Sequence, residues 1–224
     1  MSKNKQLVIV GAGEFALIAY EYFTYDSDYE VAAFSVNKDF IKAASINGKP
    51  LIELEKLYDN YPPSDFDVFV AIPASGLNRV RTRIFNEMKD KGYTLATYIS
   101  SHAFVWHNAI IGENCFIFEN NTVQPFVTIE DNVILWSGNH IGHRTVIRKN
   151  SFITSHVVIS GYCDIGSGSF IGVNSTFNDK TSIAENCILG SGSVVTKNLA
   201  QAEVIYVGNP AKAFPRKSAF DVEL

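Results

Sequence analysis

The sequence predicts two successive domains: an α/β N-terminal Rossmann-like domain over residues 1–100 and a parallel β-helix over residues 101–224. Two observations carry this prediction. Residues 104–199 divide into sixteen segments of six residues, here called hexads, without a break in register. Ahead of them, an apolar run at residues 7–10 ends in a glycine-containing turn that precedes apolar residues at helical spacing, as in a βαβ unit.

The hexads share a pattern of large apolar and small residues. A period of six fits neither a helix nor an alternating strand; it is typical of a parallel β-helix, with three short strands in each coil of about eighteen residues. The sixth position is mostly small or compact. The second positions, which predict a stacked inner column, are Val105, Ile111, Ile117, Val123, Ile129, Leu135, Ile141, Ile147, Ile153, Ile159, Ile165, Ile171, Phe177, Ile183, Leu189 and Val195. Glycine fills five third positions, where we expect sharp turns with positive φ: Gly112, Gly142, Gly166, Gly172 and Gly190.

The first hundred residues alternate between strand and helix patterns. This alternation predicts parallel strands joined by right-handed crossovers. We expect strands at residues 7–10, 30–34, 66–72 and 93–99, and helices at residues 16–25 and 78–91.

The turn at residues 11–16 fits the dinucleotide-binding pattern G-x-G-x-x-A. An NAD site would also want an acidic residue at the end of the second strand, where Ser35 and Val36 stand, so a dehydrogenase is disfavoured. We expect instead a phosphate or sugar cradle at the N-terminus of the following helix; a turn that needs glycine only for packing is the alternative. The candidate substrate-binding residues here are Gly11, Ala12, Gly13, Glu14, Phe15 and Ser35.

Composition argues against several function classes. The net charge is −4 and there is no basic stripe, so nucleic acid is not an expected partner. The sequence contains no run of about 18 apolar residues, the length that a membrane-spanning helix needs. Cys115, Cys163 and Cys187 all occupy sixth positions of hexads, which predicts core residues rather than disulfides or metal ligands. We expect a cytoplasmic protein.

Candidate chemistry centres on the hexad HIGHRT, residues 140–145. Because residues eighteen apart stack between coils, His143 shares a column with Pro125, Gly161 and Asp179. His143 occupies an outward-pointing corner, and an imidazole is a ready general base near neutral pH. Two alternatives stay open. In one, His143 only packs at a surface or interface; in the other, the histidines bind zinc. The spacing of the histidines does not favour convergence on one ion, so no metal is expected. The supporting candidates close in sequence are His140, Asn139, His156 and Trp136.

The repeats, the glycine turn and the closing motif Gly208-Asn209-Pro210-Ala211-Lys212 resemble the left-handed β-helix acyltransferases. Within them, the two-part layout is similar to the nucleotide-sugar N-acetyltransferases of the bacillosamine and perosamine pathways and to the sialic acid O-acetyltransferase group. The resemblance implies a left-handed coil, a homotrimer with sites between neighbouring subunits, acetyl-CoA as co-substrate, and a nucleotide sugar held by the N-terminal domain.

The resemblance also implies residue roles. His143 matches the catalytic histidine and would accept a proton as the sugar amine attacks the thioester, and Gly161 would line the region of the developing oxyanion. Trp136 would shape the sugar pocket or pack against a neighbouring subunit. The family's acid after the histidine is Arg144 here, so His140 or an acid from another chain is the expected substitute. The expected cofactor-binding residues are Gly161, Lys197, Gly208, Pro210, Ala211 and Lys212.

The function that the resemblance implies is acetyl-CoA-dependent N-acetylation of a nucleotide-linked amino-deoxysugar in surface glycan biosynthesis. Two alternatives remain open. One keeps the fold but transfers the acetyl group to a hydroxyl of a sugar or sialic acid. The other is a non-catalytic trimeric scaffold, which would neither bind acetyl-CoA nor depend on His143.

Overall fold

The computed structural model describes residues 5–224 and divides into two compact units. The first unit comprises the residues up to Pro73 together with Arg81–Tyr98, and the second comprises Ala74–Val80 together with Ile99–Leu224. Among the described residues, no helix is long and apolar enough to cross a membrane.

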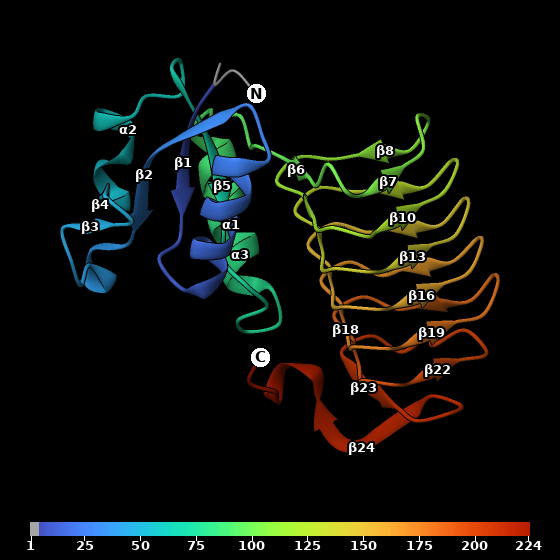
Figure 1. Ribbon diagram of the computed structural model, residues 1–224. Coiled ribbons are helices and arrows are strands. Elements are labelled where there is room, and N and C mark those ends of the chain that lie inside the picture. The colour runs from blue at the N-terminus through green and yellow to red at the C-terminus, as the bar shows by residue number, and fades with distance from the viewer. Residues whose placement is uncertain (1–4) are drawn as a thin grey trace. The chain divides into compact units, whose positions relative to one another are not determined.

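The first unit is built around a five-stranded sheet in the order β3-β4-β2-β1-β5, in which β1, β2, β4 and β5 run parallel (Figure 1). The short β3 joins β4 in an antiparallel hairpin. The strands are β1 (Lys5–Val10), β2 (Tyr29–Val36), β3 (Ser45–Ile46), β4 (Lys49–Glu53) and β5 (Phe66–Val70). The helices are α1 (Glu14–Tyr25), α2 (Leu57–Asn60) and α3 (Arg79–Asp90), with 3-10 turns η1 (Lys38–Phe40) and η2 (Leu54–Lys56).

Apolar side chains on both faces of this sheet hold the helices. Phe69 on β5 meets Phe23 of α1, with ring centroids 5.3 Å apart. Its neighbours Val68 and Val70 point to the opposite face and pack in one buried cluster with Ile84 of α3. Parallel strands that are covered on both faces read as continuous apolar runs, which is why residues 7–10 show no alternation.

Two features of this part of the chain differ from the prediction. The hairpin of β3 and β4 was not predicted, although its turn holds Asn47 and Gly48, both at positive φ, in a dipeptide that favours such hairpins. The strand expected at residues 93–99 is not continuous. Leu95 forms an isolated bridge with Val68, and only β6 (Tyr98–Ile99) is a strand.

The second unit is a parallel β-helix in which every predicted hexad begins with a two-residue strand. From β7 to β19, each strand pairs in parallel with the strand eighteen residues further on, as the ladder of β7, β10, β13, β16, β19 and β22 shows in Figure 1. The strands are β7 (Phe104–Val105), β8 (Ile110–Ile111), β9 (Phe116–Ile117), β10 (Thr122–Val123), β11 (Thr128–Ile129), β12 (Ile134–Leu135), β13 (His140–Ile141), β14 (Val146–Ile147), β15 (Phe152–Ile153), β16 (Val158–Ile159), β17 (Asp164–Ile165), β18 (Phe170–Ile171), β19 (Thr176–Phe177), β20 (Ser182–Ile183), β21 (Ile188–Leu189) and β22 (Val194–Val195). From Ile117 onward the second-position side chains are at most 2% exposed. The predicted fold class, Rossmann-like α/β followed by a left-handed parallel β-helix, is confirmed.

The corners of the coil use glycine differently from the expectation. Positive φ occurs at the fifth position of the hexads, from Asn114 to Gly192, and asparagine fills six of these positions. The third-position glycines have ordinary φ. They are needed for space instead: a Cβ on Gly142 would lie 2.5 Å from the main-chain carbon of Ser160 in the next coil. The predicted positive φ at the third position is therefore wrong, and close approach of successive coils explains those glycines.

Sixth-position side chains fill the interior next to the inner column. Cys115, Cys163 and Cys187 are all buried, as predicted for core residues. Their neighbours at equivalent positions, such as Thr145 and Ser151, are also buried.

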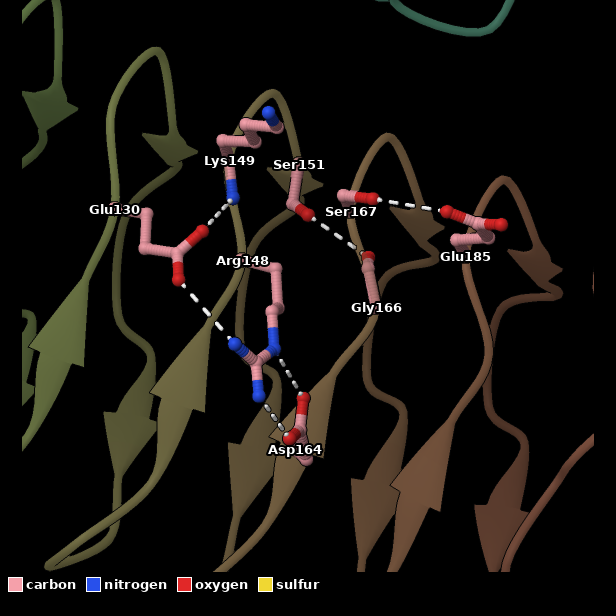
Figure 2. A network of polar contacts seen from close by, with 8 residues as sticks. All are labelled: Glu130, Arg148, Lys149, Ser151, Asp164, Gly166, Ser167 and Glu185. Atoms are coloured by element: carbon pink, nitrogen blue, oxygen red, sulfur yellow. Dashed lines mark hydrogen bonds and ion pairs between the residues drawn. The ribbon is translucent and has the colours of Figure 1, made fainter.

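Charged side chains join successive coils on the outside. Arg148, just after β14, donates from Nε and Nη2 to the two carboxylate oxygens of Asp164 at 3.0 and 2.7 Å, as Figure 2 shows. Its Nη1 lies 3.4 Å from Glu130 Oε1, and the other oxygen of Glu130 accepts the main-chain N–H of Lys149 at 2.9 Å. This network spans three coils.

The end of the second unit closes the helix. β23 (Val204–Val207) extends the sheet of β21, and β24 (Lys212–Ser218) pairs with it in antiparallel fashion before η3 (Ala219–Asp221). The segment Ala74–Val80 packs on this unit through Leu77, which joins a buried cluster with Ile188 and Ala219. Asn78 Nδ2 donates to the carbonyl of Gly168 at 2.9 Å.

Candidate active site

The candidate site lies at the corner that joins β13 to β14. His143 occupies the fourth position of its hexad and is exposed on this corner. The eighteen-residue repeat places it in one column with Pro125 of the preceding coil and Gly161 and Asp179 of the following two, as the sequence predicts. The chemistry of the corner therefore depends on contacts between coils.

Three contacts with two residues, Gln124 and Tyr162, hold His143. Its main-chain N–H donates to Gln124 Oε1 at 2.9 Å. Its ring meets the Tyr162 ring edge to face, with centroids 5.2 Å apart and an interplanar angle of 81°. Its carbonyl accepts the N–H of Tyr162 at 2.9 Å. The imidazole is thus exposed but has a defined orientation.

The third side of the imidazole is the bare main chain of Gly161. A Cβ at this position would lie 2.5 Å from His143 Cε1 and 2.9 Å from each ring nitrogen. The three atoms nearest to this Cβ all belong to the imidazole, so only a movement of the ring could relieve the clash. Glycine at 161 is therefore required for the observed position of His143.

The main-chain N–H of Gly161 already has an acceptor. It donates to Asp179 Oδ1 at 2.7 Å, across one coil. The sequence predicts that Gly161 lines the region of the developing oxyanion, where a main-chain N–H would donate to substrate. In the structure, the N–H of Gly161 donates to Asp179 instead. The contribution of Gly161 that the geometry supports directly is the space it gives to His143.

Arg144, which follows His143, stacks between two aromatic rings. Its Cζ lies 4.4 Å from the centroid of the Phe126 ring and 6.0 Å from that of Tyr162. Its φ of 59° puts it in the left-handed region shared by the other fifth positions. The residue after the histidine therefore presents a cation held by aromatic faces instead of a carboxylate.

The supporting candidates separate into two groups. His140 starts β13, paired with Thr122 and Val158 on either side, on the same strand that leads to His143. Asn139 lies at the preceding corner, just before β13, and His156 lies at the equivalent corner one coil further on, just before β16. Asn139 is 1% exposed, and its side-chain oxygen accepts the N–H of Val157 at 2.8 Å. It therefore joins two successive coils.

Trp136 lies at the corner before β13, and His156 lies over that corner in the next coil. The His156 ring lies over Gly138, where a Cβ would come within 2.7 Å of Nδ1. The Trp136 ring packs between Phe118 and Phe152, with centroids 4.3 and 6.1 Å away. The structure therefore does not gather the imidazoles and Trp136 into one cluster, because a strand separates the two corners.

The closing motif forms the turn between β23 and β24. The N–H of Gly208 donates to Ser193 Oγ at 3.0 Å, and the N–H of buried Ala211 donates to the carbonyl of Val194 at 2.8 Å. Pro210 follows a cis peptide bond. The exposed Lys212 begins β24, and the exposed Lys197 follows β22, so both lysines lie at the C-terminal end of the β-helix.

The glycine turn of the first unit follows β1. Gly11 has φ 144°, its N–H donates to the carbonyl of Ser35 at 2.8 Å, and a Cβ there would lie 2.6 Å from the carbonyl oxygen of Ala71. Ala12, Gly13 and Glu14 lead into α1 and are at least partly exposed. Phe15 differs from the others, because it is 4% exposed and packs edge to face on Phe69.

Ser35 is the other notable residue of this region. It is fully buried at the end of β2, and its Oγ has no hydrogen-bond partner among the described residues. An unsatisfied buried hydroxyl is uncommon and costs stability, so its presence beside the glycine turn needs an explanation.

Three residues around His143 were not singled out as site residues from the sequence: Gln124, Tyr162 and Asp179. Gln124 precedes His143 by nineteen positions, and Tyr162 follows it by nineteen. Asp179 belongs to the column that the sequence predicts but was given no role, and applying the same eighteen-residue stacking to the neighbours of His143 would have found Gln124 and Tyr162. Among residues 5–224, no group of three or more His, Cys, Asp or Glu side chains could hold a metal ion.

Comparisons with known proteins agree with this architecture. The family model "Bacterial transferase hexapeptide (six repeats)" matches residues 108–143 and 162–197. The acetyltransferase domain of PglB from Neisseria gonorrhoeae FA1090 is 26% identical, with a TM-score of 0.84 over 94% of this chain and 100% of that chain. That domain has also been solved in complex with acetyl coenzyme A.

Two further structures share the fold. PerB from Caulobacter crescentus, in complex with CoA and GDP-perosamine, is 24% identical, with a TM-score of 0.83 over 93% of this chain and 97% of that chain. WeeI from Acinetobacter baumannii AYE is 21% identical, with a TM-score of 0.72 over 94% of this chain and 100% of that chain. The chain is thus similar across both of its units to the acetyltransferase domain of PglB, and its β-helix carries the repeats that the hexapeptide family model describes.

Proposed function

We propose that this chain transfers an acetyl group from acetyl-CoA to the amino group of a nucleotide-linked amino-deoxysugar, with His143 as general base. The observation that carries the proposal is the exposed imidazole of His143, whose ring is bounded by Gly161 and Tyr162, while Gln124 accepts the main-chain N–H of His143. The similarity to the PglB acetyltransferase domain, solved with acetyl coenzyme A, supports the acyl donor.

In this mechanism, the sugar amine attacks the thioester carbonyl carbon directly. His143 accepts the proton that the nitrogen loses, and the C–S bond breaks as the amide forms. The departing CoA thiolate takes the proton back from the imidazole. No covalent enzyme intermediate is needed, and the buried positions of Cys115, Cys163 and Cys187 argue against a thiol nucleophile.

The first unit, within the proposed nucleotide-sugar domain of residues 1–100, would bind the acceptor. The turn formed by Gly11, Ala12, Gly13 and Glu14 leads into α1, whose N-terminal N–H groups favour an anionic group such as phosphate. Ser35, near the end of the neighbouring strand β2, belongs to the same proposed site; its carbonyl accepts the N–H of Gly11, and its buried Oγ has no hydrogen-bond partner among the described residues. Phe15 would support this turn through its packing rather than by contact.

The second unit, within the proposed acyltransferase domain of residues 101–224, would bind acetyl-CoA toward its C-terminal end. Lys197 and Lys212 are exposed cations suited to phosphate, and the turn at residues 208–211 is fixed to β22 by main-chain bonds. A homotrimer, a cytoplasmic location and a role in surface glycan biosynthesis belong to the same proposal.

A substrate panel tests the proposed reaction. Release of free CoA from acetyl-CoA is measured with UDP-, dTDP- and GDP-linked amino-deoxysugars, alongside sugars and sialic acids that offer only hydroxyl groups. Turnover with an amino sugar, and formation of its N-acetyl product by mass spectrometry, is the expected result.

Each other outcome has a definite meaning. Turnover confined to hydroxyl acceptors would replace N-acetylation by O-acetylation on the same fold. No turnover with any acceptor and no binding of acetyl-CoA by calorimetry would support the non-catalytic scaffold.

A further inference from the structure

Asp179 fixes the main chain of Gly161 from the next coil. The carboxylate lies in the turn after β19, and its Oδ1 accepts the N–H of Gly161 at 2.7 Å. The adjacent N–H of Lys180 donates to the carbonyl of Gly161 at 2.9 Å. The turn at residues 179–180 therefore binds Gly161 at both of its main-chain polar groups.

Gly161 in turn bounds the imidazole of His143. A single added carbon on Gly161 would come within 2.5 Å of the ring, so the ring lies directly against this main chain. The following residue, Tyr162, supplies a second boundary through its edge-to-face contact with the ring. A rotation or shift of the chain at Gly161 would move both boundaries together.

We propose that Asp179 is a positioning residue that holds the His143 imidazole in its reactive orientation through Gly161. The inference rests on the proposed function, in which His143 is the general base. The neighbour of His143 along the chain is Arg144, whose guanidinium is held by Phe126 and Tyr162. Orientation therefore comes from the column of stacked coils rather than from an acid next to the base in sequence.

The chain contains a matched bond away from the site. Asp131 Oδ1 accepts the N–H of Glu113 at 2.8 Å, also across eighteen residues, at the corner between β11 and β12. Asp131→Ala removes the same kind of carboxylate-to-amide bond as Asp179→Ala. It controls for any general loosening of the coil.

The first test measures the environment of the His143 imidazole by NMR and does not depend on enzymatic activity. The ring Cε1–H signals are recorded by NMR in protein carrying labelled histidine, and His143→Ala assigns the signal of His143. Asp179→Ala should shift or broaden that signal, Asp131→Ala should leave it in place, and Asp179→Asn should largely restore it, because an amide oxygen can also accept the Gly161 N–H. An unmoved signal in Asp179→Ala, with the variant folded by circular dichroism, would overturn the proposal.

The second test reads the reaction. Because small misplacements of a reacting group are costly, Asp179→Ala should lower kcat by about tenfold or more. The KM for acetyl-CoA should stay within about twofold of the wild-type value. Asp179→Asn should recover most of kcat, and Asp131→Ala should keep it.

A double variant separates the inference from the proposed function. In a His143→Ala background, Asp179→Ala should cause no additional loss, since its effect acts through the imidazole. A further loss equal to that in the wild-type background would show that Asp179 acts elsewhere and refute the positioning role. Full activity of His143→Ala itself would refute His143 as the base, while the NMR result would still decide whether Asp179 positions the ring.

Discussion

The two classes of corner glycine predict different responses to one added methyl group. Gly166 occupies a third position with ordinary φ, and a Cβ there would lie 2.5 Å from the carbonyl oxygen of Ala184 and the nitrogen of Glu185. Gly192 occupies a fifth position with φ 68°, and no atom lies within 4 Å of its would-be Cβ. The first site lacks space, and the second has space but a left-handed main chain.

These geometries set the expected magnitudes. Gly192→Ala should cost about 1–2 kcal/mol, the usual penalty for an L-residue in the left-handed region. Gly166→Ala should cost about 3 kcal/mol or more, the upper end for overpacking, because main-chain atoms of the next coil must move. Gly192→Asn should be nearly neutral, since asparagine occupies the equivalent position in six hexads.

The assay is reversible urea unfolding followed by circular dichroism, at one protein concentration for all variants. The three free energies of unfolding should rank Gly192→Asn above Gly192→Ala above Gly166→Ala. If Gly192→Ala loses more stability than Gly166→Ala, the assignment of the third position to space and of the fifth to conformation is incorrect.

Three other predictions concern titration and surface charge. Burial raises the pKa of the Cys163 and Cys187 thiols, so a thiol reagent at pH 8 should leave both unmodified in the folded protein and label them after denaturation. Burial also raises the pKa of Tyr93 to about 12, so the folded state retains the phenolic proton after the unfolded chain has lost it near pH 10. The free energy of unfolding should therefore fall between pH 10 and 12, and it should fall less steeply in Tyr93→Phe. The pair of Arg148 and Asp164 is exposed, so Arg148→Ala should lower the free energy of unfolding by at most about 1 kcal/mol, with a smaller effect at high salt; an effect independent of salt would contradict this.

Much of the β-helix could be predicted because its sequence repeats. Each strand of the coil starts where the hexad register places it, since one inward position per strand must be apolar for the core to be continuous. The role of the third-position glycines could not be predicted from the repeat. Glycine serves both left-handed turns and close approach, and only the stagger of Gly142 against Ser160 in the next coil distinguishes them.

The site was predicted in part for a related reason. His143 stands out as an exposed imidazole in a regular column, and the column itself follows from the period. Gln124 and Tyr162 act from neighbouring coils, and proximity along the chain pointed instead to Asn139 and His156, which a strand separates from His143. In a β-helix, contacts across eighteen or nineteen residues outweigh contacts across three.

The central claim, that His143 is the general base of an acetyl transfer, is tested most directly by the turnover of His143→Ala. CoA release is measured with the acceptor found in the substrate panel, and His102→Ala, which removes another exposed imidazole, is the control. The account predicts that kcat falls about 10²- to 10⁴-fold in His143→Ala, with acetyl-CoA binding retained, and is unchanged in His102→Ala. Wild-type kcat in His143→Ala would contradict it.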